Sequence, residues 1–483
     1  MAVRFSKTFK FASYSYLNQA VTMLLQLVQV KVLTNFLAIN SYGGWNQVHI
    51  AENLLLVLVN LNIGHGFIRF ASSYTPDQKQ KTYSSVFIFQ SFLAFLFFVI
   101  LIPFYKPVTN FLIGFPSESV YLLMGLLLFL VISIDNIQRF LLVSGRELQM
   151  IRQNLIRGVS DVCFTLLGVL IKQDIIGAIG GYVTSKLFCF ILFSWINKID
   201  YRKLTFSFDI IKTLLKFSLP LLSISIAYWV INSSNRYLIN HFIDLDAVGL
   251  FSVANRLPMM LVIIFTLLST IFLSNISRLF DAGNFERVSY WFSIILRLFF
   301  VVGIAGGAFL IVASRPFTLI ISNEEYLFDG LPLVYLYVSI GSLAFGGFQI
   351  ISRLYDLEKK VYQNSFIWVL AMIMNLILNV VLIPIYGIIG AAISTGSTFL
   401  ISFIISIIRR PRRINVNVFW GKIAVFGIFS LFVAYLFTLT PGYEEQSIFL
   451  GLFYSFIIGG TSLLIGLGIK IITIREILEL IRK

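Results

Sequence analysis

The sequence predicts an all-α integral membrane protein with fourteen transmembrane helices, and three observations lead to that prediction. Of the 483 residues, 58% are hydrophobic and 12% are charged, whereas soluble domains carry about 25% charged residues. Apolar runs follow one another along the whole chain, and a membrane span needs roughly 20 such residues. Lysine and arginine gather in alternate connections between the runs. Together with a mean hydropathy of +0.89, these features exclude an ordinary soluble enzyme.

The apolar runs set the expected helices in order. We expect spans at 12–38, 48–70, 83–105, 119–141, 153–172, 175–196, 214–240, 247–275, 289–313, 332–352, 362–383, 387–408, 418–439 and 447–469. The first run follows Arg4, Lys7 and Lys10 and is too long for a signal peptide, so we interpret it as a retained helix. Lys172–Asp174 and Pro384–Tyr386 are expected to be tight turns between paired helices.

The distribution of positive charge orients the predicted helices. With the N-terminus inside, 29 of the 37 lysine and arginine residues fall in cytoplasmic segments, and three fall in outside loops: Lys106, Lys172 and Arg315. Cytoplasmic loops carry an excess of lysine and arginine. The pattern therefore predicts both termini in the cytoplasm and a multi-pass protein of the cytoplasmic (inner) membrane.

Several classes of site are not expected. The two cysteines, Cys163 and Cys189, both lie in apolar runs, and the three histidines are scattered, so neither a disulfide framework nor a metal site is predicted. The net charge of +15 is spread over short groups between apolar runs, which favours anionic lipid rather than nucleic acid as the partner. No G-x-x-x-x-G-K-[ST] run is present, and we expect neither ATPase activity nor an organic cofactor.

An internal repeat divides the chain into lobes. A shift of 210 residues overlays IIGAIGGYVTS (175–185) on IYGIIGAAIST (385–395), and a shift of 205 overlays KVLTNFLAINSYGG (31–44) on RYLINHFIDLDAVG (236–249). We therefore expect two pseudo-symmetric six-helix lobes, at 1–200 and 201–410. Residues 411–483 would add two further helices and an amphipathic cytoplasmic tail. Because six is even, the lobes share one orientation, as in transporters with a site at the repeat interface.

Ionisable residues inside the predicted spans are candidate functional residues. A charge at the centre of a membrane helix costs roughly 2.5–3.5 kcal/mol, so such residues should face the bundle interior or a wet cavity. The cations that we select are Lys31, Arg236 and Arg256, and the acids are Glu52, Asp135 and Asp161. Two alternatives stay open: Lys31 and Arg236 can reach the outer headgroups, and Lys31 can form a structural pair with Glu52. Lys186 and Arg297 can likewise simply reach the interface.

Three stretches carry a resemblance to a known family. Residues 219–257 (LPLLSISIAYWVINSSNRYLINHFIDLDAVGLFSVANRL), 375–398 (NLILNVVLIPIYGIIGAAISTGST) and 33–48 (LTNFLAINSYGGWNQV) resemble the polysaccharide transporters of the MOP exporter superfamily, which include O-antigen and oligosaccharide flippases. The resemblance implies a V-shaped pair of lobes and alternating access. Family members often carry an acid before the arginine that ends the seventh helix, whereas here Asn235 precedes Arg236.

The resemblance also implies a cargo. It predicts a flippase that moves a polyprenyl-(pyro)phosphate-linked oligosaccharide to the outer leaflet for cell-surface polysaccharide such as lipopolysaccharide, alongside a polymerase and chain-length proteins. Lys31, Arg236 and Arg256 would bind the phosphate, because lysine and arginine side chains both pair with phosphate. Two alternatives are a drug/cation antiporter of the same superfamily and a membrane sugar polymerase. The polymerase would need a larger outside loop than this chain offers.

Amides and acids complete the predicted site. Six amides on the first and seventh helices are candidate sugar contacts, although bonds between helices would explain them equally well: Asn18, Gln19, Gln26, Gln29, Asn232 and Asn235. Glu52, Asp135 and Asp161 are candidates for carrying a coupling proton or Na⁺. An inward-negative potential is a further source of energy, worth about 2.3 kcal/mol per charge per 100 mV.

Overall fold

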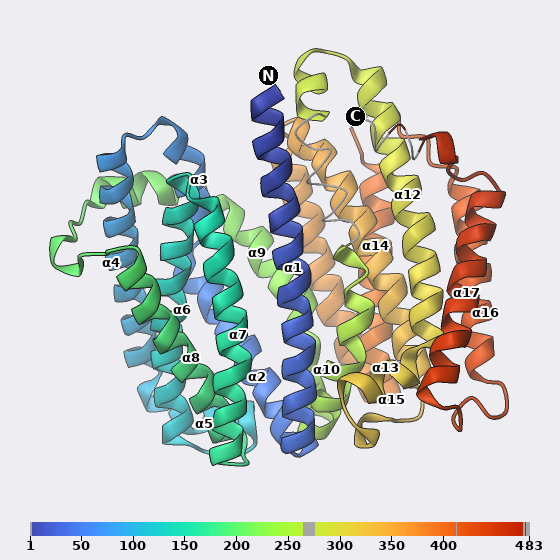
Figure 1. The fold of residues 1–483 in the computed structure, drawn as a ribbon, viewed down its shortest axis with the longest axis horizontal. Coiled ribbons are helices and arrows are strands. Elements are labelled where there is room, and N and C mark those ends of the chain that lie inside the picture. The colour runs from blue at the N-terminus through green and yellow to red at the C-terminus, as the bar shows by residue number, and fades with distance from the viewer. Residues whose placement is uncertain (1, 264–275, 412, 477–478, 480–483) are drawn as a thin grey trace. The chain divides into compact units, whose positions relative to one another are not determined.

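The computed structural model describes residues 2–263, 276–411, 413–476 and 479. All regular elements of this part of the chain are helical (Figure 1). Two compact units divide the chain: the first is Met1–Trp229 with Asp244–Gly249, and the second is Val230–Ile243 with Leu250–Lys483. The lobe boundaries expected from the repeat stay a prediction.

The first unit contains eight complete α-helices and the start of a ninth. They are α1 (Ala2–Phe36), α2 (Ile39–Asn60), α3 (Ile63–Phe70), α4 (Pro76–Leu101), α5 (Tyr105–Ile113), α6 (Glu118–Val143), α7 (Glu147–Ile171), α8 (Ile175–Ile196) and the first part of α9 (Phe208–Phe242). Short 3₁₀ turns lie at Ala71–Ser73, Ile102–Phe104 and Tyr201–Lys203. The most buried of the span-length helices are α6 and α8, with 61% and 50% of their apolar windows buried, so they form the core of this unit.

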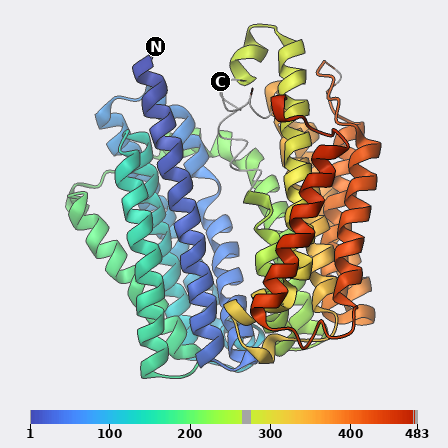
Figure 2. The same ribbon diagram turned by 45° about the vertical axis from the view of Figure 1, so that its right-hand side comes forward.

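The second unit is built around α12 and α14. Its helices are the end of α9, most of α10 (Leu245–Met259), α12 (Phe285–Val312), α13 (Ser314–Ile321), α14 (Leu331–Leu357), α15 (Val361–Ile408), α16 (Trp420–Thr438) and α17 (Ile448–Gly468), with a 3₁₀ turn at Glu324–Tyr326. In α12 and α14, 72% of the apolar window is buried. Figure 2 shows α16 and α17 beside α12 at the edge of this unit. Both edge helices keep large apolar side chains exposed, such as Phe449, in the manner of lipid-facing surface.

The described helices overlap each range expected from the apolar runs, but several ends differ. Helix α4 begins at Pro76 rather than 83, because Thr75 and Gln78 form a capping box that the apolar run does not include. Helix α2 begins at Ile39 rather than 48, and a 52° bend separates it from α3. The connections between the expected spans 83–105 and 119–141, and between 289–313 and 332–352, contain α5 and α13. Residues 264–275 of the expected eighth span, and residues 477–478 and 480–483 of the expected tail, lie outside the described residues.

Helix α15 contains two helices joined at a reversal of the chain. Gly387 has φ +57° and ψ −135°, a non-helical conformation that glycine adopts most readily. Asn375 Nδ2 donates to Thr398 Oγ1 at 3.2 Å, and Ser394 Oγ donates to the Asn375 carbonyl at 3.2 Å. These bonds show that the halves lie side by side, as the expected turn at Pro384–Tyr386 requires.

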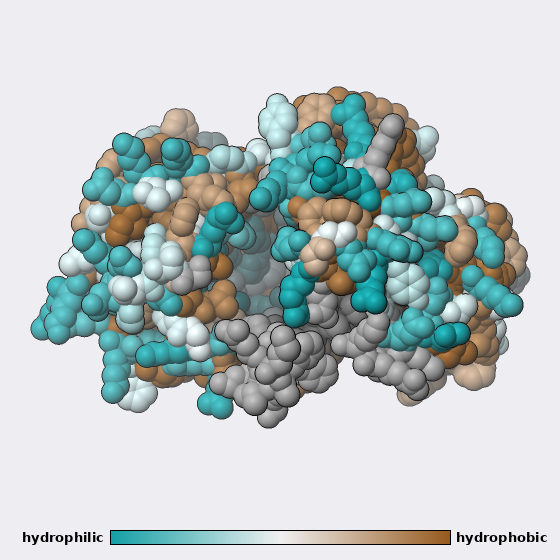
Figure 3. All heavy atoms as spheres, turned by 90° about the horizontal axis from the view of Figure 1, so that it is seen from above, coloured by the Kyte–Doolittle hydropathy of each residue, from teal (hydrophilic) through white to brown (hydrophobic). Residues whose placement is uncertain are grey.

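The described residues include ten helices that are long and apolar enough to cross a membrane, or eleven when the bent pair α2–α3 counts as one span. This count treats α15 as one helix. The protein is therefore a multi-pass membrane protein, while the number fourteen stays a prediction. Figure 3 views the end of the first unit at which α1 begins, and hydrophilic residues gather on the face of that unit seen there, as expected at a membrane surface.

Contacts inside the units follow the internal repeat. Gln29 on α1 donates to Thr165 on α7 at 3.4 Å, and Ser234 on α9 donates to Asn375 on α15 at 3.4 Å. The repeat shift of 205 residues carries Gln29 onto Ser234, and the shift of 210 residues carries Thr165 onto Asn375. The same pair of helices is therefore joined at the same height in each half, in agreement with two related lobes.

Candidate functional site

The three cations expected to bind a phosphate are all half-buried, and they lie on α1, α9 and α10. Lys31 lies near the end of α1 in the first unit. Arg236 lies near the end of α9, and Arg256 lies near the end of α10; both belong to the second unit. Their role in a common site stays a prediction.

The side chain of Arg236 is oriented by groups on α9 and α10. Its Nε donates to Ser252 Oγ at 3.2 Å, and its Nη1 donates to the carbonyl of Asn232 at 2.9 Å. The guanidinium carbon lies 5.5 Å from the centre of the Phe251 ring, a cation–π distance. The hydroxyl, the carbonyl and the ring are all neutral, and these three contacts orient the guanidinium.

Four of the six amides expected to contact sugar differ in their environments: Gln26, Gln29, Asn232 and Asn235. Gln26 is exposed, and Gln29 and Asn232 are half-buried. Gln29 makes the bond to Thr165 described above. Asn235 is 2% exposed and donates to Thr395 Oγ1 at 3.4 Å. Gln29 and Asn235 therefore join helices, the alternative that the sequence left open.

Asn235 belongs to a buried polar cluster that the sequence analysis did not select. Asn379 Nδ2 donates to Asn375 Oδ1 at 3.0 Å, and Asn375 in turn joins the second half of α15. Within the described part of the chain, the Oδ1 atoms of Asn235 and Asn379 accept no hydrogen bond. The members of this amide cluster, all buried, are Ser234, Asn235, Asn375, Asn379, Ser394, Thr395 and Thr398. The spacing of Asn375 and Asn379, four residues apart on one helix face, was the available signal.

Asp161 lies in a buried ion pair between α7 and α8. Both of its carboxylate oxygens accept from Lys186 Nζ at 2.7 Å, and Oδ1 also accepts from Ser185 Oγ at 2.7 Å. Lys186 is 4% exposed, and its Nζ lies 4.2 Å from the centre of the Tyr182 ring. Lys186 therefore does not reach the interface, and its partner is an acid that the sequence assigned to ion coupling.

The other two candidate acids are also close to bases of their own unit. Glu52, 6% exposed, lies 3.2 Å from Nδ1 of His49 on the next turn of α2. The His49 ring packs edge-on against Trp45 and Tyr182, with ring centres 4.5 and 4.6 Å apart. Asp135 accepts from Arg139 Nε at 2.8 Å on α6. Each of the three acids therefore lies beside a basic side chain of its own unit, and their role in ion coupling stays a prediction.

Arg297 shows that a second membrane-embedded cation has a structural partner. It lies 8% exposed on α12, and its Nη2 lies 3.1 Å from Glu476 Oε1 in the C-terminal segment. Nη1 donates to the carbonyl of Ile471 at 3.4 Å. The arginine thus ties the segment after α17 to the core of the second unit.

Comparison with known proteins places this arrangement in a family. A family model described as "Polysaccharide biosynthesis protein" matches residues 32–329, which is more than half of the chain. The chain belongs to this family of polysaccharide biosynthesis proteins. No curated protein matches the sequence. The match includes Arg236 and Arg256 and begins one residue after Lys31, and it confirms the resemblance drawn from the sequence.

Solved structures share the fold of this polysaccharide biosynthesis protein. One is titled as the lipid II flippase MurJ in an inward closed conformation: it is 18% identical, with a TM-score of 0.72, over 95% of this chain and 98% of that chain. An inward-facing multidrug resistance MATE transporter of the MOP superfamily is 14% identical, with a TM-score of 0.63, over 85% and 96%. A MOP superfamily transporter from Pyrococcus furiosus, whose title reports a binding pocket of reverse polarity, is 13% identical, with a TM-score of 0.58, over 88% and 96%. At these identities the likeness establishes the fold, which is of the MOP type.

Proposed function

We propose that this protein is a flippase that moves a polyprenyl-(pyro)phosphate-linked oligosaccharide from the cytoplasmic to the outer leaflet by alternating access. Its family and its MOP-type fold support transport in polysaccharide biosynthesis. In this proposal the protein resides in the inner membrane with both termini in the cytoplasm. It works with a polymerase and chain-length proteins that assemble cell-surface polysaccharide, such as an O-antigen.

The observation that carries the proposal is the oriented arginine on α9. The polyprenyl tail of such a cargo can stay in lipid, whereas its phosphate loses hydration on the way across and needs a replacement for the lost water. Arginine pairs with phosphate through parallel N–H groups in a fixed plane. The bonds from Arg236 to Ser252 and to the Asn232 carbonyl hold that plane. Arg256 and Lys31 supply further positive charge within the membrane-spanning helices.

Energy for transport comes, in this proposal, from an ion gradient or from the membrane potential. Protonation of Asp161 would neutralise the partner of Lys186 and release that lysine, so a proton can alter the packing of α7 on α8. Glu52 and Asp135 offer the same chemistry through His49 and Arg139. Na⁺ binding to any of these carboxylates would act in the same sense.

The test is deletion of the gene followed by extraction of the membrane lipids. We expect one complete lipid-linked oligosaccharide to accumulate on the inner leaflet, because its assembly continues while its export stops. Unchanged glycolipid pools with lost drug resistance would instead indicate the antiporter, and truncated precursors alone would indicate an enzyme.

The same deletion strain tests the cationic site. Complementation with Arg256→Ala should leave the lipid accumulated although the variant reaches the membrane in normal amounts, whereas the wild-type gene should clear it. Normal export by Arg256→Ala would remove this arginine from the proposed site.

A further inference from the structure

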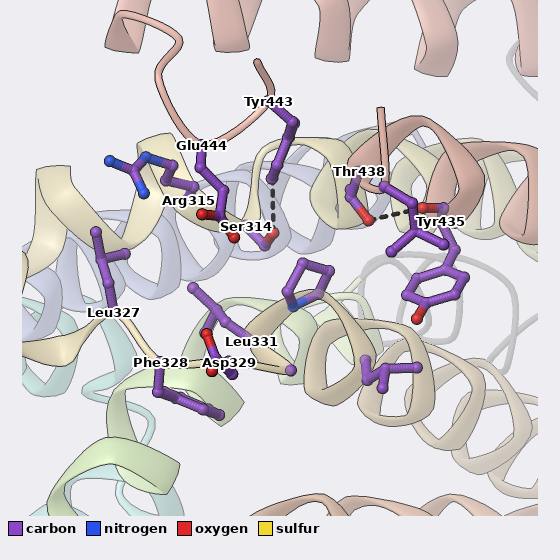
Figure 4. A pocket seen from close by; sticks show the side chains of 14 residues that line it. Ser314, Arg315, Leu327, Phe328, Asp329, Leu331, Tyr435, Thr438, Tyr443 and Glu444 are labelled. Atoms are coloured by element: carbon purple, nitrogen blue, oxygen red, sulfur yellow. Dashed lines mark hydrogen bonds between the residues drawn. The ribbon is translucent and has the colours of Figure 1, made fainter. Parts of the chain in front are cut away.

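A pocket of about 280 Å³ lies at one end of the second unit (Figure 4). Three segments that are distant in the sequence form its walls: the start of α13, the residues that lead into α14, and the end of α16 with the loop after it. The charge pattern predicts that the loops near 314–331 and 439–447 both face outward. The pocket would then open at the outer membrane surface, where exported cargo leaves.

A short chain of hydrogen bonds holds one wall of the pocket in place. Tyr443, 4% exposed, donates to the carbonyl of Val312 at 3.0 Å. Its hydroxyl also lies 3.0 Å from Ser314 Oγ, and Ser314 is fully buried. Burial raises the pKa of Tyr443, so the hydroxyl stays protonated and able to donate at neutral pH. These bonds join the loop after α16 to the start of α13, so the pocket is a formed part of the unit rather than a gap between loops.

The polar groups on the walls suit a hydroxyl-rich ligand. Asp329 and Glu444 come from different loops, and both side chains are exposed. Neither carboxylate makes an ion pair within the described part of the chain. Arg315 adds donors, and its buried Nε makes no hydrogen bond to any described residue. Carboxylates accept two hydrogen bonds from neighbouring hydroxyls, and the guanidinium donates in a fixed plane.

Aromatic rings supply the apolar part of the lining. In Figure 4 the rings of Phe328 and Tyr435 lie at opposite ends of the open space, and Leu331 lies between them. The C–H faces of a sugar ring pack against such rings, while its hydroxyls meet the polar walls. Ligand pockets usually measure about 300–1,000 Å³, so this one fits a small unit of a larger cargo.

We propose that this pocket binds one neutral or amino-bearing sugar unit of the glycan at the outer end of the second unit. The proposal rests on the proposed function and adds to it a subsite that holds the glycan after the phosphate has crossed. Two carboxylates against one arginine disfavour phosphate, so this subsite differs in charge from the arginines of α9 and α10. A metal ion is also disfavoured, because the described residues contain no group of three or more histidine, cysteine, aspartate or glutamate side chains placed to hold one.

The test is direct binding of soluble sugars to the purified full-length protein in lipid nanodiscs. Methyl glycosides of glucose, N-acetylglucosamine and glucosamine are the probes, and saturation-transfer NMR is the readout for them. Inorganic phosphate and Ca²⁺ carry no C–H protons, so their binding is measured for comparison by isothermal titration calorimetry. We expect at least one glycoside to bind, and Glu444→Gln to weaken that binding about tenfold through loss of a charge-assisted hydrogen bond. Tyr435→Ala should also weaken it. Glu445→Gln, which changes the next residue along and does not line the pocket, should bind like the wild type.

The outcomes separate this subsite from the transport function. No transfer to any glycoside, equal binding by Glu444→Gln and Glu445→Gln, or binding of Ca²⁺ or phosphate in place of sugar would overturn the subsite. Glu444→Gln keeps the inference testable if Tyr435→Ala fails to fold, because Glu444 is exposed. Lipid pools that stay unchanged after gene deletion would refute the flippase while leaving measured sugar binding intact.

Discussion

Asp161 and Lys186 show how one membrane-embedded residue depends on another. Transfer of either charge out of water costs several kcal/mol, and the attraction between them offsets this only while both partners are present. Their separation of 2.7 Å and the bond from Ser185 supply that compensation. The sequence identified both as charges within spans, but it did not pair them.

At this scale we predict that Asp161→Asn destabilises the protein by about 3–5 kcal/mol, because Lys186 stays buried without its counter-charge. Thermal unfolding of the purified protein in detergent measures the loss. The double variant Asp161→Leu with Lys186→Met should recover most of the stability, since no uncompensated charge remains.

Lys172→Met provides the control for that comparison. It breaks the ion pair of Lys172 with Asp174, whose side chains are 55% and 39% exposed, and exposed pairs contribute about 1 kcal/mol or less. Equal effects of Lys172→Met and Asp161→Asn would contradict a structural role for Asp161. Full stability of the double variant together with failed export would assign Asp161 to coupling as well.

Helices α7 and α8 pack closely enough that single glycines matter. A Cβ on Gly181 would lie 2.2 Å from the carbonyl oxygen of Phe164, whereas a Cβ on Gly180 would meet nothing within 4 Å. Small residues of this kind allow helices to approach in membranes, where the hydrophobic effect does not drive helices together.

We predict that Gly181→Ala lowers the melting temperature, because the helices must separate to admit the methyl group, at a cost of about 1–3 kcal/mol. Gly180→Ala, at the neighbouring position, is the matched control. It should be neutral or slightly stabilising, since alanine favours helix over glycine by about 1 kcal/mol. A melting temperature that falls equally in both variants would show that the α7–α8 contact is looser than described.

The ends of the helices show how accurately the apolar runs predict where a helix begins and ends. Helix α8 begins and ends where the sequence predicts, because Asp174 caps it directly and accepts from the Gly177 N–H at 2.8 Å. Helix α4 begins earlier than predicted, because its first turns are polar and only the capping box marks the start. Hydropathy detects the part of a helix in lipid, whereas capping sets the end of the helix in water.

At the scale of the whole molecule, the charge distribution makes a prediction about topology. In a background of Cys163→Ala and Cys189→Ala, we expect Glu325→Cys and Glu445→Cys to react with a membrane-impermeant maleimide in intact cells. Asp200→Cys and Asp281→Cys should react only after permeabilisation, because lysine and arginine gather in their loops. All four positions are exposed at the ends of their units. The opposite labelling pattern would invert the topology and place the sugar pocket on the cytoplasmic side.

Composition and apolar runs determined, from the sequence alone, that this is a helical membrane protein. They did so because lipid leaves the backbone few choices other than a helix. They also located the membrane-embedded charges and amides.

Only the tertiary structure decided which of those residues meet. The partners Asp161 and Lys186, Arg297 and Glu476, and the walls around Tyr443 come from separate helices or loops. A helical period tells which face a side chain occupies, but it does not tell which other helix packs against that face.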